Sequence, residues 1–439
     1  MTDIRTAKYA NELSQLIKVE TISTFNQTDK TKFYKFHDAL REMFPLLFEV
    51  CTFEDFDGSF LMRWQGKTNK EPILLMNHHD VVEATGEWNY EPFSGEIADG
   101  KLWGRGTLDT KGGLWAMMQA AEELIKEGFI PERDIYFLSA CTEECDGSGA
   151  DTISKALEKR GLHFYMVLDE GGFILEEPIA GAKGKFAVIG VGEKGCADLK
   201  FIAHSRGGHA SIPPKNTPLV RLGKFMAEVE KKNLFKTEMA PVIHATFKSL
   251  SSTMSGPLKF VLKNSRLFKP LLLKAMPLVS DAAGAMLRTT VAFTMSSGSE
   301  GTNVLPQEAW VIANMRYSHH QGGKSSIEAI TKLAEKYDIE TVVLDPGVDS
   351  PVSDHNSDAY KLVDKAVTNV FADVKTTPYI MTAASDSRFM WRISENCLRF
   401  APFSITDEQL EGIHGINENV DLSALAPAVD FYRYIIKNA

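Results

Sequence analysis

Five acidic or imidazole side chains follow directly after short apolar runs, each of the length of a buried strand. They are His78 and Asp80, Glu143 and Glu144, and Asp169. The carboxyl ends of parallel strands meet at one edge of an open α/β sheet, so side chains that follow such strands converge although they are far apart in sequence. Imidazole and carboxylate groups are ligands that zinc and similar divalent ions accept. The pattern therefore predicts a metal site at this edge of the sheet.

Two of these pairs have alternative interpretations. His78-His79-Asp80 could be a polar loop, but a His-x-Asp segment also offers a metal-binding imidazole and a nearby carboxylate that fixes its tautomer. Glu143-Glu144 could be a solvated acidic turn. Beside a cation, however, one of these carboxylates can bind the metal while its neighbour accepts a proton from water.

A glycine-rich loop at 104–113 contains a further carboxylate, Asp109. The loop resembles a phosphate cradle at a helix N-terminus, but it lacks the Gly-Lys-Ser/Thr ending of a P-loop. Alternatively, its glycines allow a tight turn that presents Asp109, whose carboxylate could bridge two cations. His414 is a lone loop histidine and indicates little by itself.

The elements that must position these groups alternate between strand and helix. Such alternation predicts an α/β domain with a mostly parallel central sheet flanked by helices. A strand at 377–381 and a helix at 422–436 indicate that the end of the chain joins the same domain. The earlier strands are predicted at 72–76, 135–138 and 165–168, with a helix at 113–128 whose apolar residues recur at helical spacing.

The middle of the chain has a different pattern. Residues 197–203 alternate polar and apolar side chains, and residues 308–316 are a further candidate strand, which together predict a half-exposed sheet. We therefore expect an inserted domain at 194–318. The catalytic domain then consists of 1–193 and 319–439.

Composition narrows the class of function. The chain has 439 residues and a formal net charge of -10, so its length favours two domains and its charge argues against nucleic acid as a partner. The N-terminal stretch lacks the apolar core of a secretory signal. Lysines and prolines interrupt the apolar region 268–286, so we expect no membrane span and no membrane partner.

The five cysteines form an odd set without the spacing of a disulfide framework. Cys141 and Cys145 could bind metal, but structural thiols are the simpler interpretation. Such a set suits a reducing compartment, and we expect a cytoplasmic protein.

Together these motifs resemble the zinc metallopeptidases typified by carboxypeptidase S, aminoacylase, acetylornithine deacetylase and succinyl-diaminopimelate desuccinylase. The motifs run in the family's order from His78 to His414. The resemblance implies two zinc ions, with cobalt or manganese as alternatives, and Asp109 as the ligand that bridges them. It places one ion on His78 and Asp169 and the other on Glu144 and His414.

The resemblance also implies roles for the two remaining acidic residues. Asp80 would orient the imidazole of His78. Glu143 would be the general base, which takes a proton from the attacking water and passes it to the leaving amine nitrogen.

The inserted segment is, by the same resemblance, an α+β dimerisation or lid domain. Gly207-Gly208-His209-Ala210-Ser211 matches the family motif in which a histidine reaches into the active site of the partner subunit. Without the family, a capping histidine in a turn explains His209 equally well. Asn303 and Arg316 match the family's substrate-contacting pair, and both donors suit an oxyanion or a carboxylate. A homodimer would then be required for turnover.

The sequence departs from the family pattern where some members carry an arginine for the substrate carboxylate. The comparable segment here, 344–351, has none. Arg388 is the substitute that we predict, because the carboxypeptidase S branch has a similar Asp-Ser-Arg segment. Arg388 could equally be a structural partner of Asp386.

An extra stretch at 257–288 is rich in apolar residues with scattered lysines. Core packing or a helical pair over the dimer interface is its simplest interpretation. A second hypothesis is an apolar wall over the active site that favours hydrophobic or fatty-acyl substrates.

The function that these features predict is hydrolysis of a peptide or N-acyl amide bond next to a free carboxylate, as in a carboxypeptidase or dipeptidase. The alternative is an N-acyl-amino-acid deacylase with a dedicated small or hydrophobic acyl substrate. A binding protein on a hydrolase scaffold is disfavoured because every expected ligand is intact. A two-metal phosphoesterase is disfavoured by the Glu143 and His209 arrangement.

Overall fold

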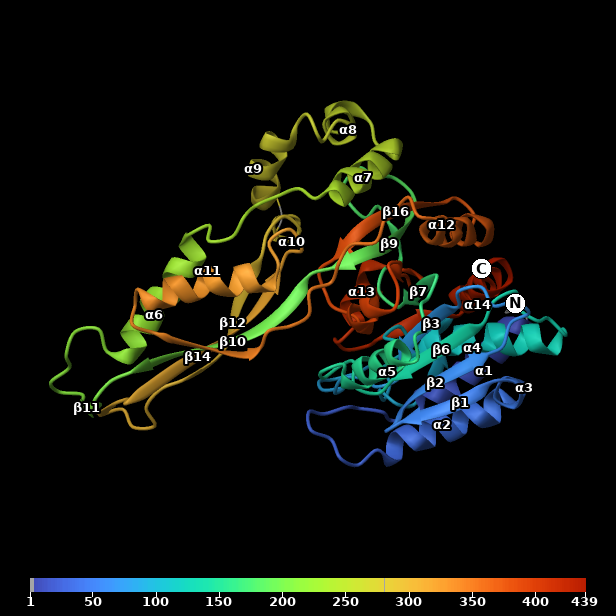
Figure 1. Cartoon of the computed structure of the whole chain (residues 1–439), viewed down its shortest axis with the longest axis horizontal. Helices are drawn as coiled ribbons and strands as arrows, with labels where there is room; N and C mark the ends of the chain where they lie inside the picture. Colours follow the sequence, from blue (N-terminus) through green and yellow to red (C-terminus); the bar gives the residue numbers. More distant parts are fainter. Residues whose placement is uncertain (1–3, 280) are drawn as a thin grey trace.

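The structure is a computed structural model that describes residues 4–279 and 281–439. It has a broad body, where the two labelled chain ends lie near one another, and one long arm (Figure 1). A ten-stranded sheet forms the centre of the body, and a four-stranded sheet forms the arm.

The central sheet is parallel in its middle and has antiparallel pairs on both sides of this middle part. The neighbouring strands β6, β3, β7 and β17 all run in the same direction. This confirms the predicted α/β class with a mostly parallel central sheet. In spatial order the strands are β1 (Thr52–Phe56), β2 (Ser59–Trp64), β6 (Ile135–Ala140), β3 (Ile73–His78), β7 (Met166–Asp169), β17 (Cys397–Arg399), β9 (Lys185–Glu193), β8 (Ile174–Glu176) and β18 (Ser404–Ile405), with β16 (Val374–Met381) paired to β9.

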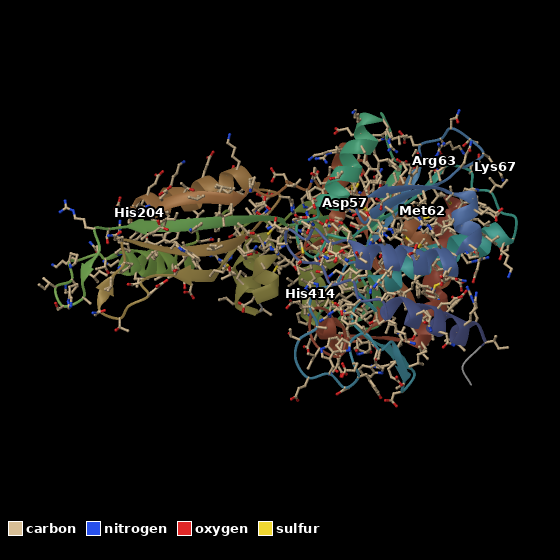
Figure 2. The ribbon with its side chains drawn as sticks, turned by 90° about the horizontal axis from the view of Figure 1, so that it is seen from below. Asp57, Met62, Arg63, Lys67, His204 and His414 are labelled. Carbon is tan, nitrogen blue, oxygen red and sulfur yellow. The ribbon has the colours of Figure 1, made fainter. Side chains whose placement is uncertain are left out.

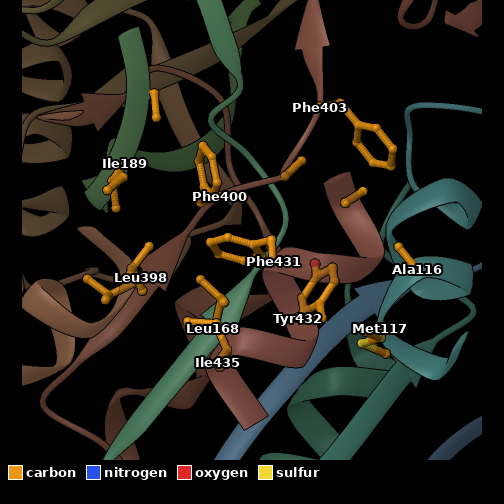
Figure 3. Close-up of a cluster of buried hydrophobic side chains, with 14 of the residues drawn as sticks. Ala116, Met117, Leu168, Ile189, Leu398, Phe400, Phe403, Phe431, Tyr432 and Ile435 are labelled. Atoms are coloured by element: carbon orange, nitrogen blue, oxygen red, sulfur yellow. The ribbon is translucent and has the colours of Figure 1, made fainter. Parts of the chain in front are cut away.

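Both faces of this sheet are covered by helices, so its central strands are apolar on both sides. Ile73 and Leu75 of β3 belong to the core formed with α1 (Ile4–Ile17), α4 (Lys111–Lys126) and α14 (Leu422–Asn438), while the alternate residues Leu74 and Met76 pack with α5 (Ser148–Lys159). Figure 3 shows side chains of α14 among those of the sheet. Continuous apolar runs are typical of strands buried on both faces, which is why the sequence predicted them well.

Smaller elements complete the body. They are the helices α2 (Thr31–Met43), α3 (Pro45–Val50), α12 (Asp358–Val370) and α13 (Asp407–Gly412), the 3₁₀ helix η2 (Asp386–Arg392), and a three-stranded sheet of β19 (Asn419–Asp421), β5 (Lys101–Trp103) and β4 (Glu96–Ala98). The loops between these elements carry Asp109 and His414.

The arm is a sheet covered on one face. Its strands are β12 (Thr290–Ser297), β14 (Glu308–Tyr317), β10 (Gly195–His204) and β15 (Glu340–Asp345), and a short ladder of β11 (Gly208–His209) and β13 (Val304–Leu305) forms its tip. Alternate residues of β10, such as Leu199 and Phe201, pack against α6 (Pro218–Lys231) and α11 (Gly323–Glu335). The strands predicted at 197–203 and 308–316 are confirmed.

The arm sheet extends past the boundary predicted at residue 318. Its fourth strand, β15, pairs with β10 and follows α11 in the chain. The short turn after β14 leads into this helix rather than back to the central sheet. The division of the chain into two domains itself stays a prediction.

A run of helices connects the arm with the body. It consists of α7 (Pro241–Leu250), η1 (Ser251–Thr253), α8 (Gly256–Lys263), α9 (Lys269–Val279) and α10 (Asp281–Ala285). Helix α7 packs on β16, where the Thr246 hydroxyl donates a hydrogen bond to the carbonyl oxygen of Pro378. Helices α8 and α9 extend away from α7 at the top of Figure 1. No helix in the described part of the chain is long and apolar enough to cross a membrane.

Candidate functional site

The candidate site lies at the carboxyl ends of neighbouring parallel strands, as the sequence predicts. His78 ends β3 and Asp169 ends β7, and the pairing of Leu75 with Leu168 brings these strand ends together. The turn with Glu143 and Glu144 follows β6, in which Ala140 pairs with His78. The loop before α4 and the loop after α13 complete the cluster with Asp109 and His414.

Asp109 occupies the centre of the cluster, between two imidazoles. Its Oδ1 lies 3.0 Å from Nε2 of His78, and its Oδ2 lies 3.0 Å from Nε2 of His414. The same His414 nitrogen is 3.1 Å from Oε2 of Glu144. Ligand atoms of His78, Asp109 and Glu144 all lie within 4.8 Å of one another, which is compact enough to hold a metal ion. The two oxygens of Asp109 thus face two different imidazoles, and its role as a bridge between two ions stays a prediction.

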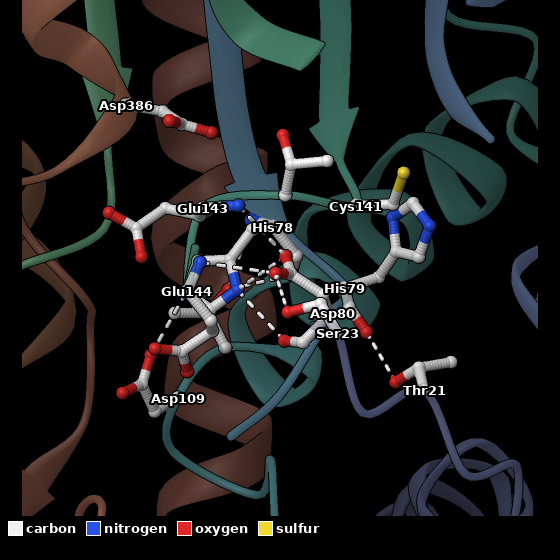
Figure 4. Close-up of polar contacts among 12 residues, drawn as sticks. Thr21, Ser23, His78, His79, Asp80, Asp109, Cys141, Glu143, Glu144 and Asp386 are labelled. Atoms are coloured by element: carbon white, nitrogen blue, oxygen red, sulfur yellow. Dashed lines mark hydrogen bonds and ion pairs between the residues drawn. The ribbon is translucent and has the colours of Figure 1, made fainter. Parts of the chain in front are cut away.

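Asp80 supports both the histidine and the acidic turn (Figure 4). The main-chain oxygen of Asp80 lies 2.9 Å from Nδ1 of His78, closer than its carboxylate at 3.4 Å. The buried carboxylate instead accepts hydrogen bonds from the backbone N–H groups of Glu143, at 3.2 Å, and Glu144, at 3.1 Å, and from the Ser23 hydroxyl, at 2.7 Å. Asp80 therefore contacts His78 mainly through its backbone and fixes the turn through its side chain.

Asp169 is buried and held by two backbone donors. Its carboxylate oxygens accept hydrogen bonds from the N–H of Glu170, at 2.9 Å, and of Ser387, at 2.8 Å. Ser387 belongs to η2, so this carboxylate links β7 to the segment with Arg388. Burial raises the pKa of Asp169 to about 6.

Arg388 points towards the expected base rather than away from the cluster. Its Nη1 lies 3.4 Å from Oε1 of Glu143 and donates to the Ser385 carbonyl oxygen at 2.9 Å. Its Nη2 lies 4.0 Å from Oδ1 of Asp386, whose buried carboxylate has no hydrogen-bond partner among the described residues. The guanidinium thus contacts both Asp386 and Glu143, and its role towards a substrate carboxylate stays a prediction.

The cluster concentrates carboxyl groups, and their pKa values respond to it. Burial raises the pKa of Glu143 to about 8 and also raises that of Glu144. Hydrogen bonds to Asp109 and Glu144 raise the pKa of His414 to about 10. Burial opposes charge on Asp109, but its contacts with His414 and His78 prevail and lower its pKa.

These shifts describe a site where protons on imidazole and carboxyl groups balance a surplus of negative charge. A buried oxygen of Glu144, Oε1, has no hydrogen-bond partner among the described residues. Divalent cations can replace such protons, and mixed imidazole and carboxylate donors suit zinc and related ions. The residues present therefore fit a metal centre.

The glycine-rich loop does cradle an anion, but the anion is the chain's own Glu418. This buried carboxylate accepts hydrogen bonds from the backbone N–H groups of Gly106, Leu108 and Asp109 at 2.8 to 3.1 Å. It also pairs with Arg105 at 2.8 Å. The loop's donors are thus already satisfied, which removes the phosphate interpretation.

Glu418 is the residue of the site that the sequence analysis missed. Arg105 also donates to the carbonyl oxygen of Gly415 at 2.6 Å, so the pair ties the loop of Asp109 to the loop of His414. The available signal was an acidic residue shortly before a short strand and an arginine in a glycine-rich loop. Neither feature predicts that these two residues form a pair, because 313 positions separate them in the sequence.

The predicted residues of the inserted segment do not join the cluster within one chain. His209 and Asn303 lie at the tip of the arm, where the N–H of Ala210 donates to the carbonyl oxygen of Asn303 at 2.9 Å. Figure 2 shows the distance between the arm, marked by His204, and the body, marked by His414. Arg316 is on β14, and its Nε donates to Asn314 at 3.0 Å.

Within the chain, the His209 ring behaves as the turn-capping interpretation describes. Its Nδ1 accepts a hydrogen bond from the backbone N–H of Ser211 at 3.1 Å. The residue nevertheless remains exposed at the end of the arm. Its contact with a partner's active site stays a prediction.

Comparison with known proteins identifies the family. The model of peptidase family M20/M25/M40 matches residues 74–438, a range that contains every expected metal ligand. The chain belongs to this family. As an M20 family member it is a hydrolase that acts on amide bonds. The M20 family is metal-dependent, and His78, Asp109 and Glu144 form a possible metal site in this chain.

Relatives of this M20 hydrolase carry two kinds of name. The probable carboxypeptidase S-like 2 of Dictyostelium discoideum is 30% identical, over 100% of this chain and 86% of the relative. The human N-fatty-acyl-amino acid synthase/hydrolase PM20D1 is 31% identical, over 97% of this chain and 87% of the relative. The fold matches that of the M20 family metallo-carboxypeptidase Sso-CP2 from Sulfolobus solfataricus, with a TM-score of 0.72, 17% identity and 98% of each chain covered.

Proposed function

We propose that this hydrolase cleaves a peptide or N-acyl amide bond next to a free carboxylate, as a carboxypeptidase or dipeptidase does. The position of Glu143 carries the proposal. It follows β6, adjacent to the ligand-type Glu144, and Asp80 holds the backbone N–H groups of both. A fixed carboxylate beside the ligands is what a general base for water requires.

Two metal ions complete the site in this proposal. His78 and Asp169 would hold one ion, Glu144 and His414 would hold the other, and Asp109 would be the ligand shared by both. Divalent ions bound by these residues would supply Lewis-acid polarisation of the scissile carbonyl and a lower pKa for the attacking water. Zinc is the first candidate, and the carboxylate-rich donor set also accepts cobalt or manganese.

The chain's own groups then move the proton and hold the geometry. Glu143 takes a proton from the attacking water and delivers it to the leaving amine nitrogen. Asp80 holds the imidazole of His78 and the backbone of the Glu143 turn in position. Arg388, 3.4 Å from Glu143, is the candidate for the free carboxylate of the substrate.

The remaining contacts require a second subunit in this proposal. His209 and Asn303 are exposed at the tip of the arm, where a partner's active site can receive them, and Arg316 completes the substrate contacts. The edge strand β12 is largely exposed, which leaves a sheet edge for a symmetric contact between two arms. The proposal therefore includes a homodimer. The five free cysteines support a reducing compartment, the cytoplasm.

One observation favours a second function, hydrolysis of N-acyl amino acids. The similarity to the N-fatty-acyl-amino acid synthase/hydrolase extends over nearly the whole chain. Both functions break an amide next to a carboxylate, so they differ only in the group on the acyl side of the bond.

A mixed panel of dipeptides and N-acyl amino acids tests both. The wild-type protein with added zinc should release the C-terminal amino acid. Glu143→Gln should retain its metal, measured by elemental analysis, yet lose about 100- to 10,000-fold in kcat. The rank of substrates separates peptidase from deacylase. Full activity of the variant, or release of any other product, would reject the proposal.

A further inference from the structure

The helices α8 and α9 form a basic, apolar surface that the proposed function does not use. The segment 256–279 contains Lys259, Lys263, Arg266, Lys269 and Lys274 and no acidic residue, in a chain of net charge -10. None of these five side chains forms an ion pair with any described residue. The segment therefore carries a concentrated positive charge. The carboxylate of Glu238 interacts electrostatically with Lys269, but no ion pair within the described part of the chain neutralises the segment.

Large apolar side chains stand among these charges. On α9, Leu271, Lys274 and Leu278 recur at helical spacing on the exposed side, while Leu272 and Met276 are buried. The two exposed leucines are 56% and 87% exposed. The other exposed apolar residues of the segment are Leu258, Phe260, Leu267 and Val279.

A basic cavity adjoins this surface. It has a volume of about 590 Å³ between α7 and the turn from α8 to α9. Lys248, Lys263, Arg266, His244 and His355 line it, and no carboxylate side chain does. Burial, together with the charges of Arg266 and Lys269, lowers the pKa of His244, as expected for uncompensated positive potential. The exposed side chain of Leu267 stands at the rim of the cavity.

We propose that the surface of α8 and α9 docks on a membrane with anionic lipids, whose headgroups enter this cavity while Phe260, Leu267 and Leu271 insert among the acyl chains. Short helices that mix lysine with leucine and phenylalanine lie in the membrane interface by this combination of forces. A protein partner would require a contiguous apolar core with a polar rim, whereas the exposed apolar side chains here are interspersed with lysines and an arginine along two short helices. The proposal revises the expectation of no membrane partner, which concerned a spanning helix.

Co-sedimentation with vesicles tests this without reference to hydrolysis. The wild-type protein should bind vesicles of phosphatidylcholine with phosphatidylserine, less at high salt, and should not bind phosphatidylcholine alone. Lys263→Glu with Arg266→Glu should lower the partition coefficient at least about tenfold. Lys18→Glu with Lys35→Glu, an equal change of charge on exposed lysines elsewhere, should leave it within about twofold.

A second pair of variants tests the exposed apolar side chains of this surface. Leu267→Ser with Leu271→Ser should weaken binding even at low salt, whereas Val50→Ser with Ile130→Ser, at comparably exposed positions, should not. Thermal melting and hydrolysis of a soluble substrate report that each variant folds.

Three outcomes would overturn the proposal. The first is equal binding to neutral and anionic vesicles, or binding that survives the charge reversal. The second is no vesicle binding while inorganic phosphate alone raises the melting temperature of the wild type and not of the charge-reversed variant, which would assign the cavity to free phosphate. The third is no vesicle binding while the apolar variant changes the sedimentation coefficient, which would make the surface a contact between copies of the chain.

Discussion

Buried acids inside the loops determine where the metal-type ligands lie. The Asp80 carboxylate accepts hydrogen bonds from backbone N–H groups of the Glu143 turn, and the Glu418 carboxylate accepts them from the Asp109 loop. Both carboxylates can influence the geometry of the candidate metal site without contacting a metal, because each fixes the backbone from which a candidate ligand projects. Partners of this kind hold ligand geometry in metal sites generally.

Replacing Glu418 should therefore affect both stability and the metal site. In Glu418→Gln, Arg105 keeps a buried charge without its partner, so the free energy of unfolding should fall by about 3 to 5 kcal/mol. Metal affinity should fall about 10- to 100-fold, because the Asp109 loop loses its anchor. Urea denaturation and metal titration measure these effects. Lys361→Gln, which removes an exposed pair with Asp358, should change neither; an equal effect of the two variants would contradict the argument.

His37 should make the protein sensitive to acid. It is buried among aromatic rings, and burial lowers its pKa from 6.5 to about 4. The unfolded chain therefore takes up a proton near pH 6.5, before the folded protein does near pH 4, so stability is present above pH 6.5 and is lost as the pH falls. The loss should approach about 3 kcal/mol. His37→Phe should flatten this part of a stability profile measured by urea denaturation, and a profile parallel to that of the wild type would contradict the argument.

At the scale of elements, sequence periodicity predicted the strands and helices that carry the ligands. The predicted helix 113–128 is α4, and the strand at 72–76 is β3, within one or two residues at each end. Short elements escaped notice, including the six-residue helix α13. Its start is fixed locally by a capping box, in which Thr406 and Gln409 each bond the other's backbone.

This cap should influence the metal site because α13 leads into His414. Thr406→Ala should cost about 1 kcal/mol in the free energy of unfolding. It should also weaken the binding of the metal that His414 helps to hold, since the preceding turn frays. Urea denaturation and metal titration measure both effects. Thr406→Ser keeps the hydroxyl and should behave as the wild type. Unchanged metal affinity in Thr406→Ala would show that the helix cap does not influence the metal site.

At the scale of the whole molecule, one chain holds a candidate metal centre in its body and two expected substrate contacts at the far tip of its arm. Turnover in the proposed homodimer then needs both chains. If the proposed homodimer has C2 symmetry and one tip contacts the partner's body, the other tip makes the same contact, because a C2 interface repeats each contact twice.

Mixing two inactive variants tests this arrangement. His209→Ala and Glu143→Gln should each be inactive as homodimers. After unfolding and refolding together, the mixed dimer contains one site with Glu143 in the body and His209 from the partner. Random pairing should restore about a quarter of the wild-type activity. A mixture as inactive as its components, with mixed dimers shown by mass spectrometry, would place His209 in its own chain's site or outside catalysis.

The sequence by itself determined the class of fold, the order of the ligand motifs and the strand ends that carry them, because apolar periodicity and residue type are local properties. Tertiary structure alone decided which distant groups meet. Glu418 fills the loop of Asp109, Arg388 contacts Glu143, and β15 extends the arm past residue 318. Each of these contacts joins segments that are more than one hundred residues apart. A buried polar group takes whichever partner the packed chain brings near, and no local pattern records that choice.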